Sequence, residues 1–183
     1  MSTRAVGGFF MLSLKWYSIM FLALLVILPI QGVVYAESFT PVSLMSTVAP
    51  AVSNIKWIGE NKKFPEPGSV NLVVFWNGVY SSSIKALAFA EKMYQKYSSG
   101  GLSVFGINDI DEEISVLFNV VSRKKISFPL GTGLGAVKAA ELYEIRGVPA
   151  IIIIDKERKV VYASEGWNFE IKTDIETIIE KML

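Results

Sequence analysis

FWNGVYSSSIKALAFAEKMYQKY, residues Phe75 to Tyr97, joins an apolar strand to a helix through a short polar turn. The strand begins upstream, because Asn71–Trp76 is a nearly continuous apolar run of the kind that is buried on both faces of a sheet. Serines 81–83 predict the helix start, since a serine side chain can cap exposed backbone N–H groups. We therefore expect a central strand that leads through a turn into an amphipathic helix.

The rest of the chain continues to alternate strands and helices. Further predicted strands are Leu102–Ile107, Ala150–Ile154 and its hairpin partner Lys159–Ala163. Further predicted helices are Asp111–Lys124, with Ile114, Leu117, Phe118 and Val121 inward, then Gly135–Tyr143, and a last helix with Ile171, Ile175, Ile178, Ile179 and Met182 on one face. A capping box of Thr173 and Glu176 predicts the start of that last helix. The pattern predicts an α/β fold with a mixed sheet of four to five strands and helices on both faces.

Composition excludes several kinds of chemistry. The chain has 18 Lys and Arg against 17 Asp and Glu, so its charge points to no nucleic acid partner. It contains no histidine and no cysteine, which removes the usual zinc and haem ligands, the usual general base near neutral pH, and every thiol reaction. We expect neither a metal site nor a cofactor.

The N-terminal 36 residues are typical of an export segment. Arg4 and Lys15 precede an uncharged apolar run, Trp16–Ala36, that ends before the first acidic residue, Glu37. Cleavage after Ala36 as a signal peptide is the first interpretation. The second is an uncleaved membrane anchor, because the run reaches the roughly 20 residues that a spanning helix needs. Both predict an extracytoplasmic protein, periplasmic or anchored in the membrane and facing outward.

Three segments follow from this division of the chain. Residues 1–36 form the signal peptide or anchor, and residues 37–69 are predicted to be a tether and an edge element, with a short strand at Ser53–Ile58. Residues 70–183 are predicted to be the folded domain, which we expect to be a monomer.

Residues 71 to about 167 resemble the TlpA/ResA-like thiol-disulfide oxidoreductases. VVFWNGVYSS resembles that family's strand and active-site turn, and YEIRGVPAIIIIDKERKVVY resembles its cis-proline loop and hairpin. Phe128-Pro129 stands where the family has Phe-Pro before its third helix. The resemblance implies a thioredoxin-like three-layer α/β/α sandwich, with Val148-Pro149 facing the active-site turn.

The same resemblance assigns the redox positions to Tyr80 and Ser83, where the family carries two cysteines separated by two residues. Disulfide exchange needs an attacking thiolate and a second thiol, and neither a phenol nor a serine hydroxyl can replace them. The family's activity cannot be carried over by this chain alone.

The residues around these positions leave several interpretations open. Ser81, Ser82 and Ser83 are either helix caps, a weak anion site, or, through the Ser82-x-x-Lys85 spacing, a serine nucleophile with a lysine base. Val148-Pro149 is either purely architectural or part of a retained peptide groove. Tyr80, at an exposed turn, could cover that groove or contact a partner. Trp76 is predicted to lie in the core, and Glu112 in the first turn of a helix.

Three functions from different classes remain. The first is a redox-inactive accessory protein that binds an envelope protein or an extended peptide through Tyr80, Ser81, Ser82, Val148 and Pro149. The second is a thiol-disulfide oxidoreductase role that depends on cysteines of a partner. The third is a serine hydrolase based on Ser82.

Overall fold

The computed structural model describes residues 42–183, which belong to one compact unit, Ser38–Leu183. Within these residues no helix is both long and apolar enough to cross a bilayer. The predicted signal peptide or anchor, residues 1–36, lies outside the described residues.

A single mixed sheet organises residues 42–183. Its strands are β1 (Lys56–Ile58), β2 (Val70–Trp76), β3 (Leu102–Asn108), β4 (Leu130–Thr132), β5 (Ala150–Ile154) and β6 (Val160–Glu165). They lie in the order β1-β4-β3-β2-β5-β6, in which β2 pairs parallel with β3 and antiparallel with β5. The sheet is mixed as predicted, but the predicted four to five strands are wrong, because the described sheet has six. The missed strand is β4, whose three residues are too few to show a periodic pattern.

The two long apolar runs form the centre of the sheet. Every residue of β2 is buried, which confirms the prediction that this strand is covered on both faces, and every residue of β5 is buried as well. Asn71 is the polar exception in β2, and its side-chain amide bonds with the backbone of Glu66 and Ser69. The amide therefore lies in the interior with its hydrogen bonds made, as a buried polar group requires.

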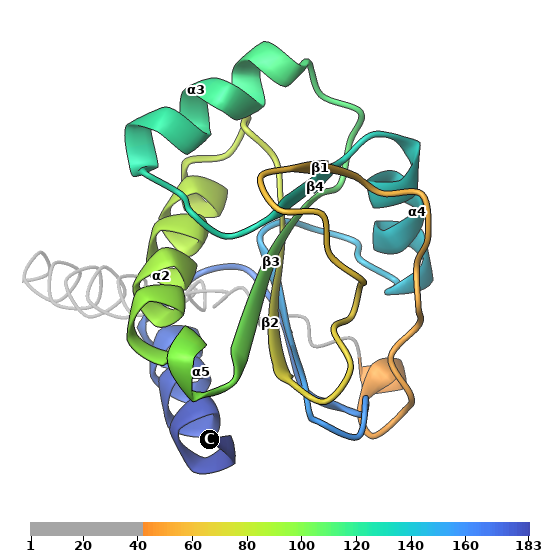
Figure 1. The fold of residues 1–183 in the computed structure, drawn as a ribbon, viewed down its shortest axis with the longest axis vertical. Coiled ribbons are helices and arrows are strands. Elements are labelled where there is room, and N and C mark those ends of the chain that lie inside the picture. The colour runs from red at the N-terminus through yellow and green to blue at the C-terminus, as the bar shows by residue number, and fades with distance from the viewer. Residues whose placement is uncertain (1–41) are drawn as a thin grey trace, which may run out of the picture. The chain divides into compact units, whose positions relative to one another are not determined.

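Helices cover both faces of this sheet. They are α2 (Ser81–Tyr97), α3 (Ile114–Lys124), α4 (Leu134–Leu142) and α5 (Phe169–Met182). Figure 1 shows α2 and α5 on one side of the sheet and α4 on the other, with α3 near one end. The alternate side chains of β2 follow this division, since Leu72 and Val74 pack in one core cluster and Val73 and Phe75 in the other. The predicted three-layer α/β/α sandwich is confirmed.

Two helix predictions need correction. In α3 only Leu117 is buried, whereas Ile114 and Phe118, predicted to point inward, are 58% and 50% exposed. The helix α5 begins at Phe169 and is capped by Asn168, whose side chain accepts a hydrogen bond from the Ile171 N–H at 2.8 Å. The predicted capping box at Thr173 is wrong because Thr173 already lies within the helix, where its hydroxyl donates to the Phe169 carbonyl.

The segment before β2 contributes to the core as well as to the sheet edge. Leu44, Ala49 and Phe64 are buried, and β1 adds an edge strand antiparallel to β4. The peptide bond between Phe64 and Pro65 is cis, which the sequence analysis did not predict. This segment therefore adds a few buried side chains to the core and one strand to the sheet edge.

Gly135 in α4 gives a test of this packing. Replacing a glycine in a helix by alanine usually stabilises the helix by about 1 kcal/mol. Here a Cβ at residue 135 would collide with the Asn54 carbonyl oxygen and would lie 2.7 Å from the Ile55 nitrogen. We expect Gly135→Ala to lower the free energy of unfolding by about 1–3 kcal/mol, measured by urea denaturation.

Gly100→Ala is the matched control, because a Cβ there would meet no atom within 4 Å. We expect this second variant to be as stable as the unchanged chain or slightly more so. Equal stability of the two variants would contradict the close approach of α4 to the segment before β1.

Candidate functional site

The site predicted from the sequence lies where β2 ends, at the turn formed by residues 77–80. Strand register places the proline loop beside it: Phe75 pairs with Ala150, the residue that follows Pro149. The Val148–Pro149 peptide bond is cis, as the resemblance implied, and the Pro149 carbonyl accepts a hydrogen bond from the Gly166 N–H at 2.7 Å. The structure therefore brings the turn and the proline loop together at the same end of the sheet.

The two predicted redox positions differ sharply in exposure. Tyr80 is 53% exposed, whereas Ser83 is 0% exposed and its buried hydroxyl has no hydrogen-bond partner among the described residues. A fully buried hydroxyl without a partner is uncommon, because its desolvation is not compensated. Ser83 is thus closed off from solvent, and Tyr80 is the accessible member of the pair.

The predicted serine cap is wrong. The N-cap residue of α2 is Tyr80, in extended backbone conformation, and no side chain caps this end. Ser81, Ser82 and Ser83 occupy the first three positions within the helix instead. The N-cap therefore lies one residue before the first serine. The turn that precedes the helix is held by contacts with distant residues, which the serine run does not indicate.

Those contacts come from the ends of two parallel strands. Trp76 pairs with Asn108 in the register of β2 and β3, so Asn77 and Asp109 leave the sheet side by side. The Asn77 side-chain nitrogen donates to an Asp109 carboxylate oxygen at 3.0 Å, and the Asn77 side-chain oxygen accepts from the Val79 N–H at 3.1 Å. Asn77 therefore ties the turn both to itself and to the neighbouring strand.

Glu112 provides the second tie. One oxygen of its carboxylate accepts hydrogen bonds from the Gly78 N–H and from the Asn108 side chain, each at 3.0 Å. The prediction that Glu112 lies in the first turn of a helix is wrong, because α3 begins only at Ile114. Its role is to accept hydrogen bonds from the turn rather than to interact with the dipole of α3.

The Glu112 carboxylate lies in close contact with Gly78. An added Cβ would lie 2.6 Å from one Glu112 carboxylate oxygen and 2.9 Å from a Val116 methyl group. Both distances are shorter than a non-bonded contact allows, so a side chain at residue 78 would displace the Glu112 carboxylate or the Val116 side chain.

The sequence analysis missed Asn77, Asn108 and Asp109. A signal for them was present, since each polar residue directly follows or ends a buried strand, and the carboxyl ends of neighbouring parallel strands meet at one edge.

Burial raises the pKa of the Asp109 carboxyl above its usual value, while the hydrogen bond from Asn77 acts to lower it. The nearby Glu112 also acts to raise the pKa.

Large apolar side chains are exposed on the turn and on the segment that follows β3. Val79 is 70% exposed, and Ile110, Ile114 and Val116 are also exposed on the segment that the Glu112 carboxylate connects to the turn. Together with Tyr80 these residues form what we call the turn patch: Val79, Tyr80, Ile110, Ile114 and Val116. A group of exposed apolar side chains marks a contact surface more often than an isolated one does.

The Ser82–Lys85 spacing gains no support from the geometry. No hydrogen bond joins the two side chains in residues 42–183, and Lys85 is exposed. A lysine that acts as a base for serine needs hydrogen-bond reach to the hydroxyl and a low pKa.

Glu112 can be tested by substitution. We expect Glu112→Ala to lower the free energy of unfolding by about 1–3 kcal/mol, because it leaves the Gly78 N–H and the Asn108 side chain without their acceptor. Glu113→Ala removes a neighbouring exposed carboxylate whose one hydrogen bond, from Ser115, is long at 3.4 Å, and it should change stability by less than about 0.5 kcal/mol. Equal effects of the two variants in urea denaturation would show that Glu112 does not hold the turn.

The fold was compared with known proteins. The sequence matches no family model and no curated protein sequence. Solved structures with the same fold include the thioredoxin domain of a thiol-disulfide oxidoreductase from Bacteroides vulgatus, with 25% identity, a TM-score of 0.63, and coverage of 74% of this chain and 97% of that one.

Two other solved structures agree with this result. A proposed thiol:disulfide interchange protein DsbE from Chlorobium tepidum has 20% identity and a TM-score of 0.65, over 75% of this chain and 96% of that one. StoA from Bacillus subtilis has 18% identity and a TM-score of 0.55, over 68% of this chain and 98% of that one. This chain therefore has the thioredoxin-like fold of thiol-disulfide oxidoreductases, in a sequence that contains no cysteine.

Proposed function

We propose that this protein is a redox-inactive, extracytoplasmic accessory protein that binds an extended segment of an envelope protein through the turn patch and the adjoining Pro149 loop. One observation carries the proposal. The turn is held by hydrogen bonds beside the Val148-Pro149 loop, while the two positions that the resemblance assigns to cysteines hold an exposed phenol and a buried serine hydroxyl. A site with an ordered turn and loop but no thiol can bind a partner without reacting with it.

The lack of cysteine restricts the chemistry directly. A disulfide is broken only by an attacking thiolate, and the chain supplies none. No observation favours the alternative in which a partner supplies both thiols, or the serine hydrolase.

The surface around the turn supports binding of a protein segment rather than of a small ion. The turn patch is apolar and exposed, and the Gly78 and Val79 N–H groups are already engaged by Glu112 and Asn77. These two turn amides are therefore not free to bind an anion. Apolar side chains of a partner segment can instead bury Val79 and Ile114, and each fully buried aliphatic side chain contributes about 1.5–3 kcal/mol.

The proposed location rests on the sequence of the N-terminal segment. A basic flank, an apolar run and a small residue before Glu37 are the features of an export signal. We propose that the folded unit acts outside the cytoplasm as a monomer, either released after cleavage or held by the uncleaved segment.

Site-specific photocrosslinking tests the proposed surface. Benzoylphenylalanine at position 80 replaces the Tyr80 ring with another aromatic group. Benzoylphenylalanine at position 156, in the exposed turn between β5 and β6, is the control. In cells of the native host we expect position 80 to give one discrete cross-linked product that position 156 does not give. Ile114→Asp, combined with the probe at position 80, should reduce that product by at least about five-fold, because it places a charge in the apolar contact.

The control for folding is the thermal unfolding midpoint of each variant, which Ile114→Asp should leave nearly unchanged because Ile114 is 58% exposed. Products of equal amount and mass from positions 80 and 156, or a product at position 80 that Ile114→Asp does not reduce, would contradict binding at the turn patch.

A further inference from the structure

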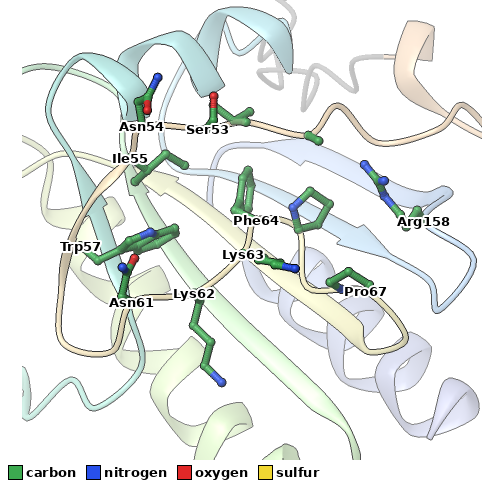
Figure 2. A pocket seen from close by; sticks show the side chains of 13 residues that line it. Ser53, Asn54, Ile55, Trp57, Asn61, Lys62, Lys63, Phe64, Pro67 and Arg158 are labelled. Atoms are coloured by element: carbon green, nitrogen blue, oxygen red, sulfur yellow. The ribbon is translucent and has the colours of Figure 1, made fainter.

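A pocket of about 680 Å³ lies apart from the turn patch, and none of Tyr80, Ser83 or Pro149 lines it. Its walls are the extended segment Ala51–Ile55, the strand β1 through Trp57, the loop Asn61–Pro67, and Arg158 from the turn between β5 and β6. Figure 2 shows the side chains that line it. Small-molecule pockets usually measure about 300–1,000 Å³, so the size suits a small organic ligand.

The charged groups in this pocket are all basic: Lys62, Lys63 and Arg158, with no acidic residue in the lining. Lys62 is neutralised locally, since its ammonium group lies 3.4 Å from Glu60 and 3.5 Å from Glu66. In Figure 2 its side chain also points away from the other labelled residues. Lys62 is therefore not the group that receives a ligand.

Lys63 and Arg158 differ from Lys62 in this respect. Neither forms an ion pair with any residue of the range 42–183. One terminal nitrogen of Arg158 donates to the Ala49 carbonyl at 3.1 Å, whereas its Nε is buried and has no partner within the same range. Figure 2 shows the Lys63 ammonium group turned toward the side on which Arg158 lies. Two positive groups without a counterion thus face one side of the pocket.

Part of the pocket lining is an aromatic wall formed by Trp57 and Phe64. The ring centroids of Trp57 and Phe64 are 6.4 Å apart, and each ring packs on Phe105, at 5.6 Å and 5.3 Å. Phe64 also packs on Tyr143, at 5.7 Å, so the wall is fixed to the buried core. Trp57 is only half-buried and leaves part of its ring available to a ligand. Such a wall favours a flat apolar group.

We propose that this pocket binds a small organic anion that carries a flat ring system, with the anionic group near Lys63 and Arg158 and the ring against Trp57, which the buried Phe64 supports. An ammonium and a guanidinium group without counterions favour a carboxylate, sulfonate or phosphate. The proposal is independent of the proposed function, because the two sites share no residue.

Calorimetric titration of the purified full chain tests this assignment with naphthalene-2-sulfonate as the probe. Naphthalene-2-sulfonamide, which has the same ring and no charge, is the matched control ligand. We expect the sulfonate to bind at least about ten-fold more tightly, since a hydrogen bond to a charged group is worth about 1.5–3 kcal/mol. Lys63→Ala should weaken sulfonate binding about ten-fold, and Lys63→Arg should largely retain it.

Lys156→Ala is the matched protein control, because it removes an exposed charge from the same hairpin turn as Arg158 without touching the pocket. It should leave the sulfonate affinity unchanged. Three results would overturn the proposal: equal affinities for the sulfonate and the sulfonamide, equal losses in Lys63→Ala and Lys156→Ala, or no binding of the sulfonate at millimolar concentration. Circular dichroism melts of each variant show that a loss of binding does not come from unfolding, and Lys63 is exposed, so its replacement leaves the core intact.

Discussion

The pairing of β2 with a parallel neighbour on one side and an antiparallel neighbour on the other is the constraint on which the rest of the structure depends. Because every residue of β2 is buried, a shift of its register by one residue would exchange the two core clusters that its alternate side chains enter. The same register sets Trp76 against Asn108 and Phe75 against Ala150. The packing of the sheet therefore places the turn, the end of β3 and the Pro149 loop at one edge.

The hydrogen bonds at that edge explain how the turn persists without sulfur. The Gly78 and Val79 amides of the turn are held by Glu112 and Asn77. These bonds satisfy backbone groups that would otherwise be costly to leave unpaired at a partly buried position. The consequence is a shaped, apolar surface around Tyr80 that is held in place by polar groups beneath it. A surface of this kind can bind a partner without any reactive atom.

The parts of the fold that depend on local patterns were predictable, and the parts that depend on distant contacts were not. The apolar run Ala150–Ile154 indicated a fully buried strand without ambiguity, whereas three-residue β4 carries too little pattern to detect. At the site, the exposed position of Tyr80 at the turn was predicted. The role of Glu112 was predicted wrongly, because the Gly78 N–H that it binds lies 34 residues away in the sequence. The burial of Ser83 is likewise a property of the packed sheet and helix, not of the serine run.

The most direct test of the account is disulfide exchange by the variant Tyr80→Cys/Ser83→Cys. Cysteine is close to serine in size and is often buried, so it suits the buried position 83. Position 80 is exposed at the N-terminal end of α2, where the helix dipole lowers the pKa of a thiol. If the frame of the redox site is intact, the variant forms an intramolecular disulfide and accelerates insulin reduction by a thiol, while the unchanged chain does not exceed a boiled control. A double variant that stays a dithiol and reduces no faster than the unchanged chain, or an unchanged chain that itself catalyses the reaction, would contradict the account.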